Sequence, residues 1–115
     1  MQKVALFAFN GEFMCFIHVL LNALDMHEKG YDVKIVIEGS ATKLIPELAN
    51  KENPMFFLYE KARNLHLIKG ACQACSNKMG TLESVKKEGI ELLNEMNGHP
   101  AIAGFREAGY DVITF

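Results

Sequence analysis

The stretch VALFAFNGEFMCFIHVLLNALDMHEKGYDVKIVI, residues 4–37, decides the fold class of this chain. Its opening run, Val4 to Phe9, is continuously apolar, which is typical of a strand covered on both faces. After a polar break, apolar residues recur at helical spacing from Glu12 to about Glu28, and Lys29-Gly30 then supplies a cationic last turn and a glycine stop. Tyr31 to Ile37, rich in Val and Ile, follows as a second strand. The order predicts a βαβ unit with a right-handed crossover.

The rest of the chain repeats this alternation less clearly. The apolar cluster Ile90 to Leu93 suits either a short fourth strand or part of one long helix, and we favour the strand because the apolar C-terminal run needs a sheet to join. We expect one domain over residues 1–115, a three-layer α/β/α sandwich with about five mainly parallel strands. The remaining predicted elements are helices from Ser40 or Thr42 to Leu48, from Pro54 to Arg63, from Thr81 to Lys87 and from Pro100 to Ala108, and strands at Leu65–Ile68 and Tyr110–Phe115.

Composition excludes several classes of function. The 115 residues are 50% hydrophobic with a formal net charge of -2, which is unlike a disordered chain. Because basic residues form no stripe, we expect no nucleic-acid partner. The longest apolar stretch, Phe13 to Leu24, is shorter than the roughly 20 residues that cross a bilayer, so we expect no membrane role. Three cysteines, an odd number, and the lack of a cleavable leader favour the reducing cytoplasm.

In such a sheet, ligands and reactive groups belong on the loops beyond the carboxyl ends of the strands. The loops after the first two strands hold Asn10 and Ser40, beside which a small molecule could bind, and no dinucleotide or Walker motif accompanies them. Only the loop after the third strand, Lys69 to Asn77, carries obvious nucleophiles, Cys72 and Cys75.

Local charge around this loop favours a reactive thiolate. A cysteine pKa near 8.5 must fall for the thiolate to be populated at neutral pH. Lys69 and Lys78 add positive charge, and a helix beginning near Ser76 to Thr81 would point its backbone N–H groups at Cys75. Gly70 and Gly80 would permit the sharp turns that hold the sulfur at the sheet edge.

The Cys-x-x-Cys spacing leaves alternatives open: a dithiol redox couple, half of a zinc site, or two structural thiols. Zinc is the weakest alternative, because a structural site needs four ligands and no second paired spacing is present. Cys15 falls in the first helix, and we expect it to be packed there. His18 is expected in the core or an interface, His66 in a strand, and His27 and His99 show no ligand pattern. We therefore predict no metal and no cofactor.

The excess of apolar residues predicts self-association. The first helix is apolar around most of its circumference. The segment Met55 to Tyr59 places bulky groups on several faces of a short helix. A small domain cannot bury all of these groups alone, so an oligomer interface competes with a pure-core explanation.

The segment Ala74-Cys75-Ser76-Asn77-Lys78-Met79 after the third strand, together with the C-terminal run Gly109 to Phe115, resembles the DsrE-like superfamily of sulfur-relay subunits (the DsrE, DsrF and TusD type). The resemblance implies a cytoplasmic α/β/α subunit that forms trimers, hexamers or mixed oligomers. In that class a cysteine at the position of Cys75 accepts persulfide sulfur from a donor protein and passes it to an acceptor. Ser76 and Asn77 match the neighbourhood of that cysteine.

Cys72 departs from the simplest pattern of this family. As a resolving or auxiliary thiol it could attack a Cys75 persulfide, release sulfide and close a disulfide. We therefore expect a sulfurtransferase acting by persulfide relay. A noncatalytic oligomeric binding or scaffold subunit and a dithiol redox protein remain as alternatives.

Overall fold

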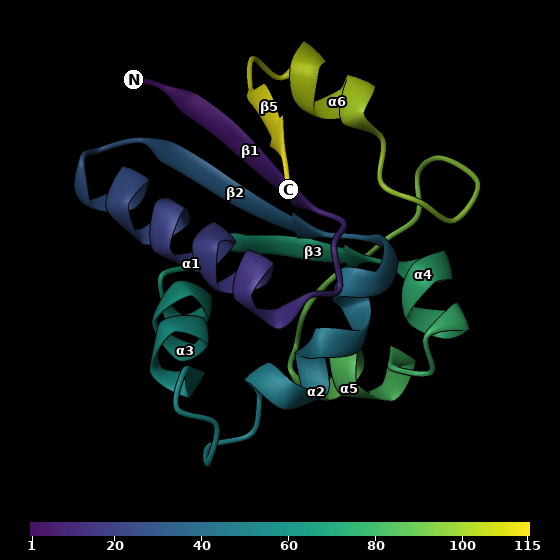
Figure 1. Ribbon diagram of the computed structural model, residues 1–115. Helices are drawn as coiled ribbons and strands as arrows, with labels where there is room; N and C mark the ends of the chain where they lie inside the picture. The colour runs from purple at the N-terminus through teal and green to yellow at the C-terminus, as the bar shows by residue number, and fades with distance from the viewer.

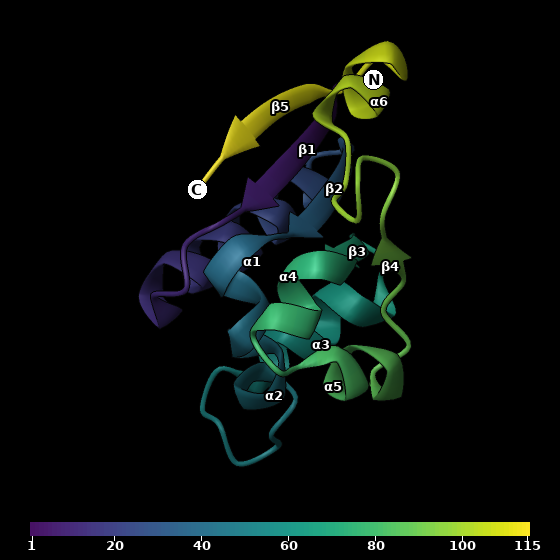
Figure 2. The same cartoon turned by 90° about the vertical axis from the view of Figure 1, so that its right-hand side faces the viewer.

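The computed structural model describes residues 1–115 and contains one five-stranded sheet in the order β4-β3-β2-β1-β5. Every neighbouring pair of strands is parallel (Figures 1 and 2). The predicted α/β fold with a parallel sheet is confirmed, and the short fourth strand is present. The strands are β1 (Lys3–Ala8), β2 (Asp32–Ile37), β3 (Ile68–Cys72), β4 (Leu92–Leu93) and β5 (Asp111–Thr114).

Helical segments connect these strands and cover the two faces of the sheet unequally. Most of them lie on one face, whereas α6 lies alone on the other (Figures 1 and 2). The segments are α1 (Phe13–Glu28), the 3₁₀ helix η1 (Gly39–Leu44), α2 (Ile45–Leu48), α3 (Phe56–Asn64), α4 (Gln73–Lys78), α5 (Leu82–Lys87) and α6 (Ile102–Glu107). None of these helices is long and apolar enough to cross a membrane.

Strand order explains the unequal layers. From β1 to β4 each connection moves in the same direction across the sheet, and the connection from β4 to β5 returns past β1. Because parallel crossovers are right-handed, a reversal of direction places the last connection on the opposite face. The chain after β3 and the chain after β4 therefore diverge to opposite faces, and in open α/β sheets ligand sites occur at such a divergence, beyond the carboxyl ends of the strands.

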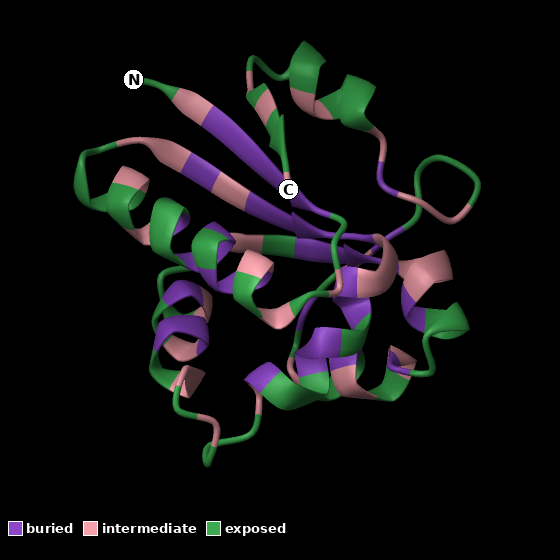
Figure 3. Ribbon diagram, viewed as in Figure 1, coloured by how far each residue is buried: buried purple, intermediate pink, exposed green.

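Alternating side chains of the strands form two apolar clusters, and much of β1 and β2 is buried (Figure 3). Leu6 and Ile35 belong to the larger cluster, which packs beneath α1, α3 and the segments η1 and α2. Phe7 and Val36 point to the other face, where Phe105 of α6 stacks edge-to-face on Phe7 with ring centroids 5.3 Å apart. Both faces of the central strands are buried, as their continuous hydrophobicity predicted.

The third strand was predicted too early in the sequence. Leu65 caps the C-terminal end of α3, and His66 occupies a left-handed turn with φ of 60°, so β3 begins only at Ile68. Gly70 lies inside this strand and forms no turn. A Cβ there would lie 2.6 Å from Leu93 Cγ, so glycine is required for the close approach of β4.

Candidate functional site

Sheet register places Glu38 and Cys72 side by side at the carboxyl edge. Ile37 of β2 pairs with Ala71 of β3, and both side chains belong to the larger apolar cluster. Because side chains alternate along extended chain, the next residues, Glu38 and Cys72, turn to the opposite face. Both are buried, with 7% and 0% of their surface exposed.

Cys72 ends β3 and also caps α4. Its Sγ accepts a hydrogen bond from the backbone N–H of Cys75 at 3.3 Å. The predicted loop from Lys69 to Asn77 is therefore wrong: Lys69 and Cys72 belong to the strand, and the helix begins at Gln73, before the predicted start near Ser76. Cys75 is the third residue of α4, half-buried at its N-terminal end.

A tight turn brings His99 back over the two cysteines. Asn97 and Gly98 have φ values of 51° and 88°, the left-handed pair that a type I′ turn needs, and Met96 bridges His99 across it. The carbonyl of Gly98 accepts a hydrogen bond from the backbone N–H of Ala74 at 2.9 Å. This bond holds the turn against the start of α4.

The result is a compact group of Glu38, Cys72, Cys75 and His99, hereafter the thiol cluster. One ligand atom from each residue lies within 4.8 Å of all the others. The His99 Nδ1 is 3.1 Å from the Cys72 Sγ, 3.8 Å from the Cys75 Sγ and 4.0 Å from the Glu38 Oε1. One imidazole nitrogen thus contacts both thiols and lies close to a buried carboxyl group.

Burial sets the electrostatics of the cluster. Loss of solvent raises the pKa of the Cys72 thiol to about 12, and negative charge on Cys75 or Glu38 acts in the same direction. Burial also raises the pKa of the Glu38 carboxyl, while a charged His99 and the hydrogen bond from Cys72 oppose that rise. At neutral pH Cys72 is therefore a protonated thiol.

Glu38 and His99 are not among the site residues that the sequence predicts. Zinc ranks as the weakest alternative there because no second ligand pair is close in sequence. The fold nevertheless brings four candidate ligands together from three separate parts of the chain. A local signal was present in Asn97-Gly98, a strong turn dipeptide that returns the chain toward the sheet immediately before His99.

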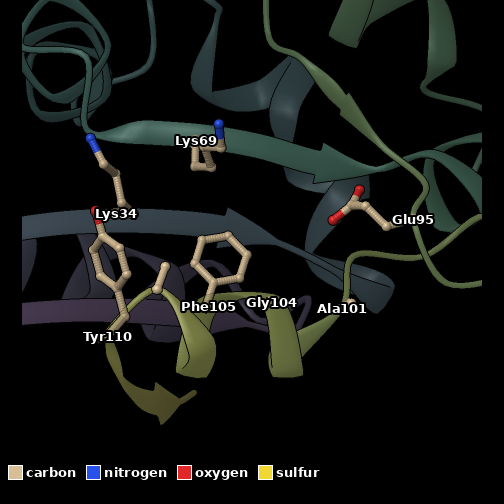
Figure 4. Close-up of a pocket in the computed structure, with 8 residues that line it drawn as sticks. Lys34, Lys69, Glu95, Ala101, Gly104, Phe105 and Tyr110 are labelled. Atoms are coloured by element: carbon tan, nitrogen blue, oxygen red, sulfur yellow. The ribbon is translucent and has the colours of Figure 1, made fainter.

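The two lysines predicted to support the thiolate are both exposed. Lys78 is exposed at the C-terminal end of α4. Lys69 lines a groove of about 360 Å³ on the α6 face, together with Lys34, Glu95 and Tyr110 (Figure 4). Neither lysine makes a hydrogen bond or ion pair with a cysteine, and their electrostatic support stays a prediction.

The other predicted site residues have varied surroundings. Ser76 is fully buried and its Oγ has no hydrogen-bond partner, whereas Asn77 is exposed. Asn10 Oδ1 accepts a hydrogen bond from the backbone of Glu12 at 2.8 Å, and Ser40 Oγ donates one to the carbonyl of Phe9 at 3.2 Å. These last two bonds shape the neighbouring turns.

Cys15, which we expected to be packed in the first helix, and His18 both lie outside the cluster. Cys15 is half-buried and lines a surface hollow, so it is not a core thiol. His18 lies in the same hollow and is exposed, so it does not belong to the core of this chain.

Fold and site together define a parallel α/β protein with a cysteine–histidine cluster at the carboxyl edge of its sheet. An uncharacterised protein of Methanocaldococcus jannaschii, MJ0733, is 30% identical over 96 residues, which cover 84% of this chain and 76% of that protein. The chain belongs to the same family as MJ0733. An uncharacterised protein of Archaeoglobus fulgidus is 44% identical over 41 residues, 36% of this chain and 67% of that protein. No protein-family model and no solved structure matches the sequence.

Proposed function

We propose that this protein carries sulfane sulfur as a persulfide on Cys75, in the manner of the DsrE-like sulfur-relay subunits that its sequence resembles. The observation that carries the proposal is the position of the half-buried Cys75 Sγ, 3.8 Å from the Nδ1 of His99. A thiol beside an imidazole has a proton acceptor within reach, and the thiolate is the reactive form of cysteine.

The transfer step follows from this geometry. His99 accepts the proton of Cys75, and the Cys75 thiolate attacks the terminal sulfur of a donor persulfide. The S–S bond of the donor breaks, a new S–S bond forms on Cys75, and the donor leaves as a thiolate that takes up a proton. No oxidant or reductant is consumed, because the sulfane sulfur keeps its oxidation state.

Cys72 is poorly suited to rapid attack on this persulfide. Attack by the Cys72 thiolate would release sulfide and form a Cys72–Cys75 disulfide. Burial keeps the pKa of Cys72 near 12, so little of that thiolate exists at neutral pH. The Cys75 persulfide should therefore survive long enough to meet an acceptor.

Assembly forms part of the proposal. Met14 and Leu21 on α1 and Phe57 on α3 are 52%, 45% and 62% exposed, a high cost for an isolated subunit. A homo-oligomer, trimer or hexamer, would cover such groups and accords with the family resemblance. Donor and acceptor proteins would then meet Cys75 at the open edge of the sheet.

The proposal is tested by exposing reduced, metal-free protein to a small-molecule persulfide and measuring intact mass. Wild type and Cys15→Ser should each gain one sulfur atom, and Cys75→Ser should gain none. Cys72→Ser should still gain sulfur, which separates the carrier from its neighbour. Equal gain on Cys75→Ser, or no gain on the wild type, would refute the assignment.

The proximity of both thiols favours a dithiol redox couple as the second candidate, since the Sγ atoms lie within 4.8 Å of each other. That function requires a disulfide that forms and reopens reversibly in a defined redox buffer. If mild oxidation of the wild type leaves both Cys72 and Cys75 as free thiols, the redox candidate fails while the carrier proposal is untouched.

A further inference from the structure

We infer that the thiol cluster is a binding site for a thiophilic divalent cation of the zinc type, held by Glu38, Cys72, Cys75 and His99. The inference stands on the donor set and its spacing, and it does not require that Cys75 carry sulfur. Two sulfurs, one imidazole nitrogen and one carboxylate oxygen form a set that zinc accepts and that calcium or magnesium, which prefer oxygen ligands alone, does not.

The spacing of the donor atoms fits one tetrahedral ion. Bonds of about 2.3 Å to sulfur and about 2.0–2.2 Å to nitrogen or oxygen place neighbouring ligand atoms about 3.4–3.8 Å apart. The distances from His99 Nδ1 to the other three residues are 3.1, 3.8 and 4.0 Å, which bracket that range. The other three pairs of ligand atoms lie within 4.8 Å of each other, so side-chain shifts of up to about 1 Å would complete the geometry.

Charge gives a second reason for a cation. The cluster gathers a buried carboxyl group and two thiols, and Cys72 and Glu38 have no lysine or arginine as an ion-pair partner. Anionic groups in such a setting are stable only when protonated or paired. A divalent ion would replace the protons of Cys72 and Cys75 and offset two of the three negative charges of the ligand set.

The backbone around the cluster resembles the outer shell that orients metal ligands. The N–H of Cys75 donates to the Cys72 Sγ, and the Ala74 N–H donates to the Gly98 carbonyl, which fixes His99 over the cysteines. The side chain of Asn94 donates to Gln73 Oε1 at 2.9 Å, a second tie between the loop after β4 and α4. These contacts hold the cysteines at the start of α4 and His99 in the loop after β4 together without the ion.

An ion can reach the site from solvent. The side chain of His99 is 41% exposed, and Cys75 is half-buried, so two ligands face outward while Glu38 and Cys72 form the buried floor. Because two ligands are buried and two are accessible to solvent, the ion can enter and leave without unfolding of the protein.

Metal binding is tested by titrating reduced, metal-free protein with Zn²⁺ against a chromophoric chelator, and with Co²⁺ as a spectroscopic probe. We expect one ion per chain, with thiolate-to-cobalt charge-transfer bands and visible bands of tetrahedral intensity. Cys72→Ser, Cys75→Ser and His99→Ala should each weaken binding by at least about a hundredfold, the upper end of the loss from outer-shell changes alone. Glu38→Gln should weaken it less, and Cys15→Ser not at all.

Thermal unfolding distinguishes a lost ligand from a lost fold. Zn²⁺ should raise the melting temperature of the wild type and of Cys15→Ser but not that of folded Cys75→Ser. Unchanged affinity in the Cys72→Ser/Cys75→Ser double variant would show adventitious surface binding and overturn the inference. So would a cobalt spectrum without thiolate bands.

One consequence rests on the proposed function: an ion held by both thiolates leaves no free nucleophile, so zinc-loaded protein should take no sulfur from a persulfide donor. The zinc titration uses no donor and therefore fails or succeeds independently. Zinc binding without sulfur loading in the metal-free protein would overturn the carrier proposal alone, and sulfur loading without zinc binding would overturn the metal site alone.

Discussion

Cys15 and Cys75 are both half-buried thiols near a helix N-terminus, yet their surroundings differ. Cys15 lines a shallow hollow with His18 and Phe115, and its Sγ makes no hydrogen bond. Cys75 lies within reach of a second thiol, an imidazole and a buried carboxyl group. Both thiols are partly exposed, so we expect the difference in their reactivity to come mainly from these partners.

The origin of the partners explains the difference. Neighbours of Cys15 are supplied mainly by its own helix, whereas those of Cys75 come from the ends of β2 and β3 and from the loop after β4. Parallel strands end at the same edge, so residues distant in sequence meet there. The carboxyl edge can assemble a site that a single helix face cannot.

The largest expected contrast is between Cys75 and its neighbour Cys72. In the native, metal-free protein at pH 7.5, iodoacetamide should alkylate Cys72 at least about a hundredfold more slowly than Cys75, because Cys72 is fully buried and its pKa is near 12. Peptide mass spectrometry of timed samples measures both rates. In denaturant the two rates should converge, and a native Cys72 that reacts as fast as Cys75 would contradict the burial argument.

Release of sulfide from a persulfide should depend steeply on pH. A raised pKa leaves Cys72 neutral below about pH 12, so its thiolate fraction grows roughly tenfold per pH unit as pH rises from 7 to 9. Sulfide release from Cys75 persulfide, followed with a sulfide electrode, should rise by nearly that factor. Cys72→Ser is the control, and release that is equally steep in that variant would assign the step to another group.

Removal of the His99 imidazole should bring the alkylation rate of Cys75 closer to that of Cys15. We expect His99→Ala to slow alkylation of Cys75 at pH 7 by roughly threefold to tenfold, since Cys75 loses the proton acceptor that lies 3.8 Å from its Sγ. His18→Ala, beside Cys15, is the matched control and should leave both rates unchanged. An unchanged alkylation rate of Cys75 in His99→Ala would show that His99 does not activate this thiol.

The smallest effect concerns the turn that positions His99. Gly98 and Gly89 have φ values of 88° and 71°, so alanine at either position should cost about 1–2 kcal/mol of unfolding free energy, measured by urea titration. Only Gly98→Ala should also slow the alkylation of Cys75. A Cβ at position 98 would lie 3.3 Å from Ala74 Cβ, whereas Gly89 has open space around it. If both variants slow the alkylation of Cys75 equally, the turn at Gly98 has no specific effect on the thiol cluster.

Much of the fold could be predicted from periodicity. Strands β1 and β2 and helix α1 followed from continuous and helical apolar patterns, and the run Tyr110–Phe115 predicted the last strand. The third strand was misplaced because Gly70 looks like a turn residue. Its real reason, the close approach of Leu93, is a tertiary contact that no local pattern contains.

The site was only half predictable for the same reason. Cys72 and Cys75 stood out because they are close in sequence and chemically distinctive. Glu38 and His99 acquire their roles from strand register and from the crossing of the loop after β4, both of which are set by packing across the sheet. Their residue types alone carry no such information.

The most direct test of the account is the ratio of alkylation rates of Cys75 and Cys15, measured peptide by peptide in one sample of reduced, metal-free wild type at pH 7. If partners rather than exposure make the thiol reactive, Cys75 should react roughly tenfold faster than Cys15. Equal rates, or a faster Cys15, would contradict the claim that the thiol cluster is the reactive centre of this protein.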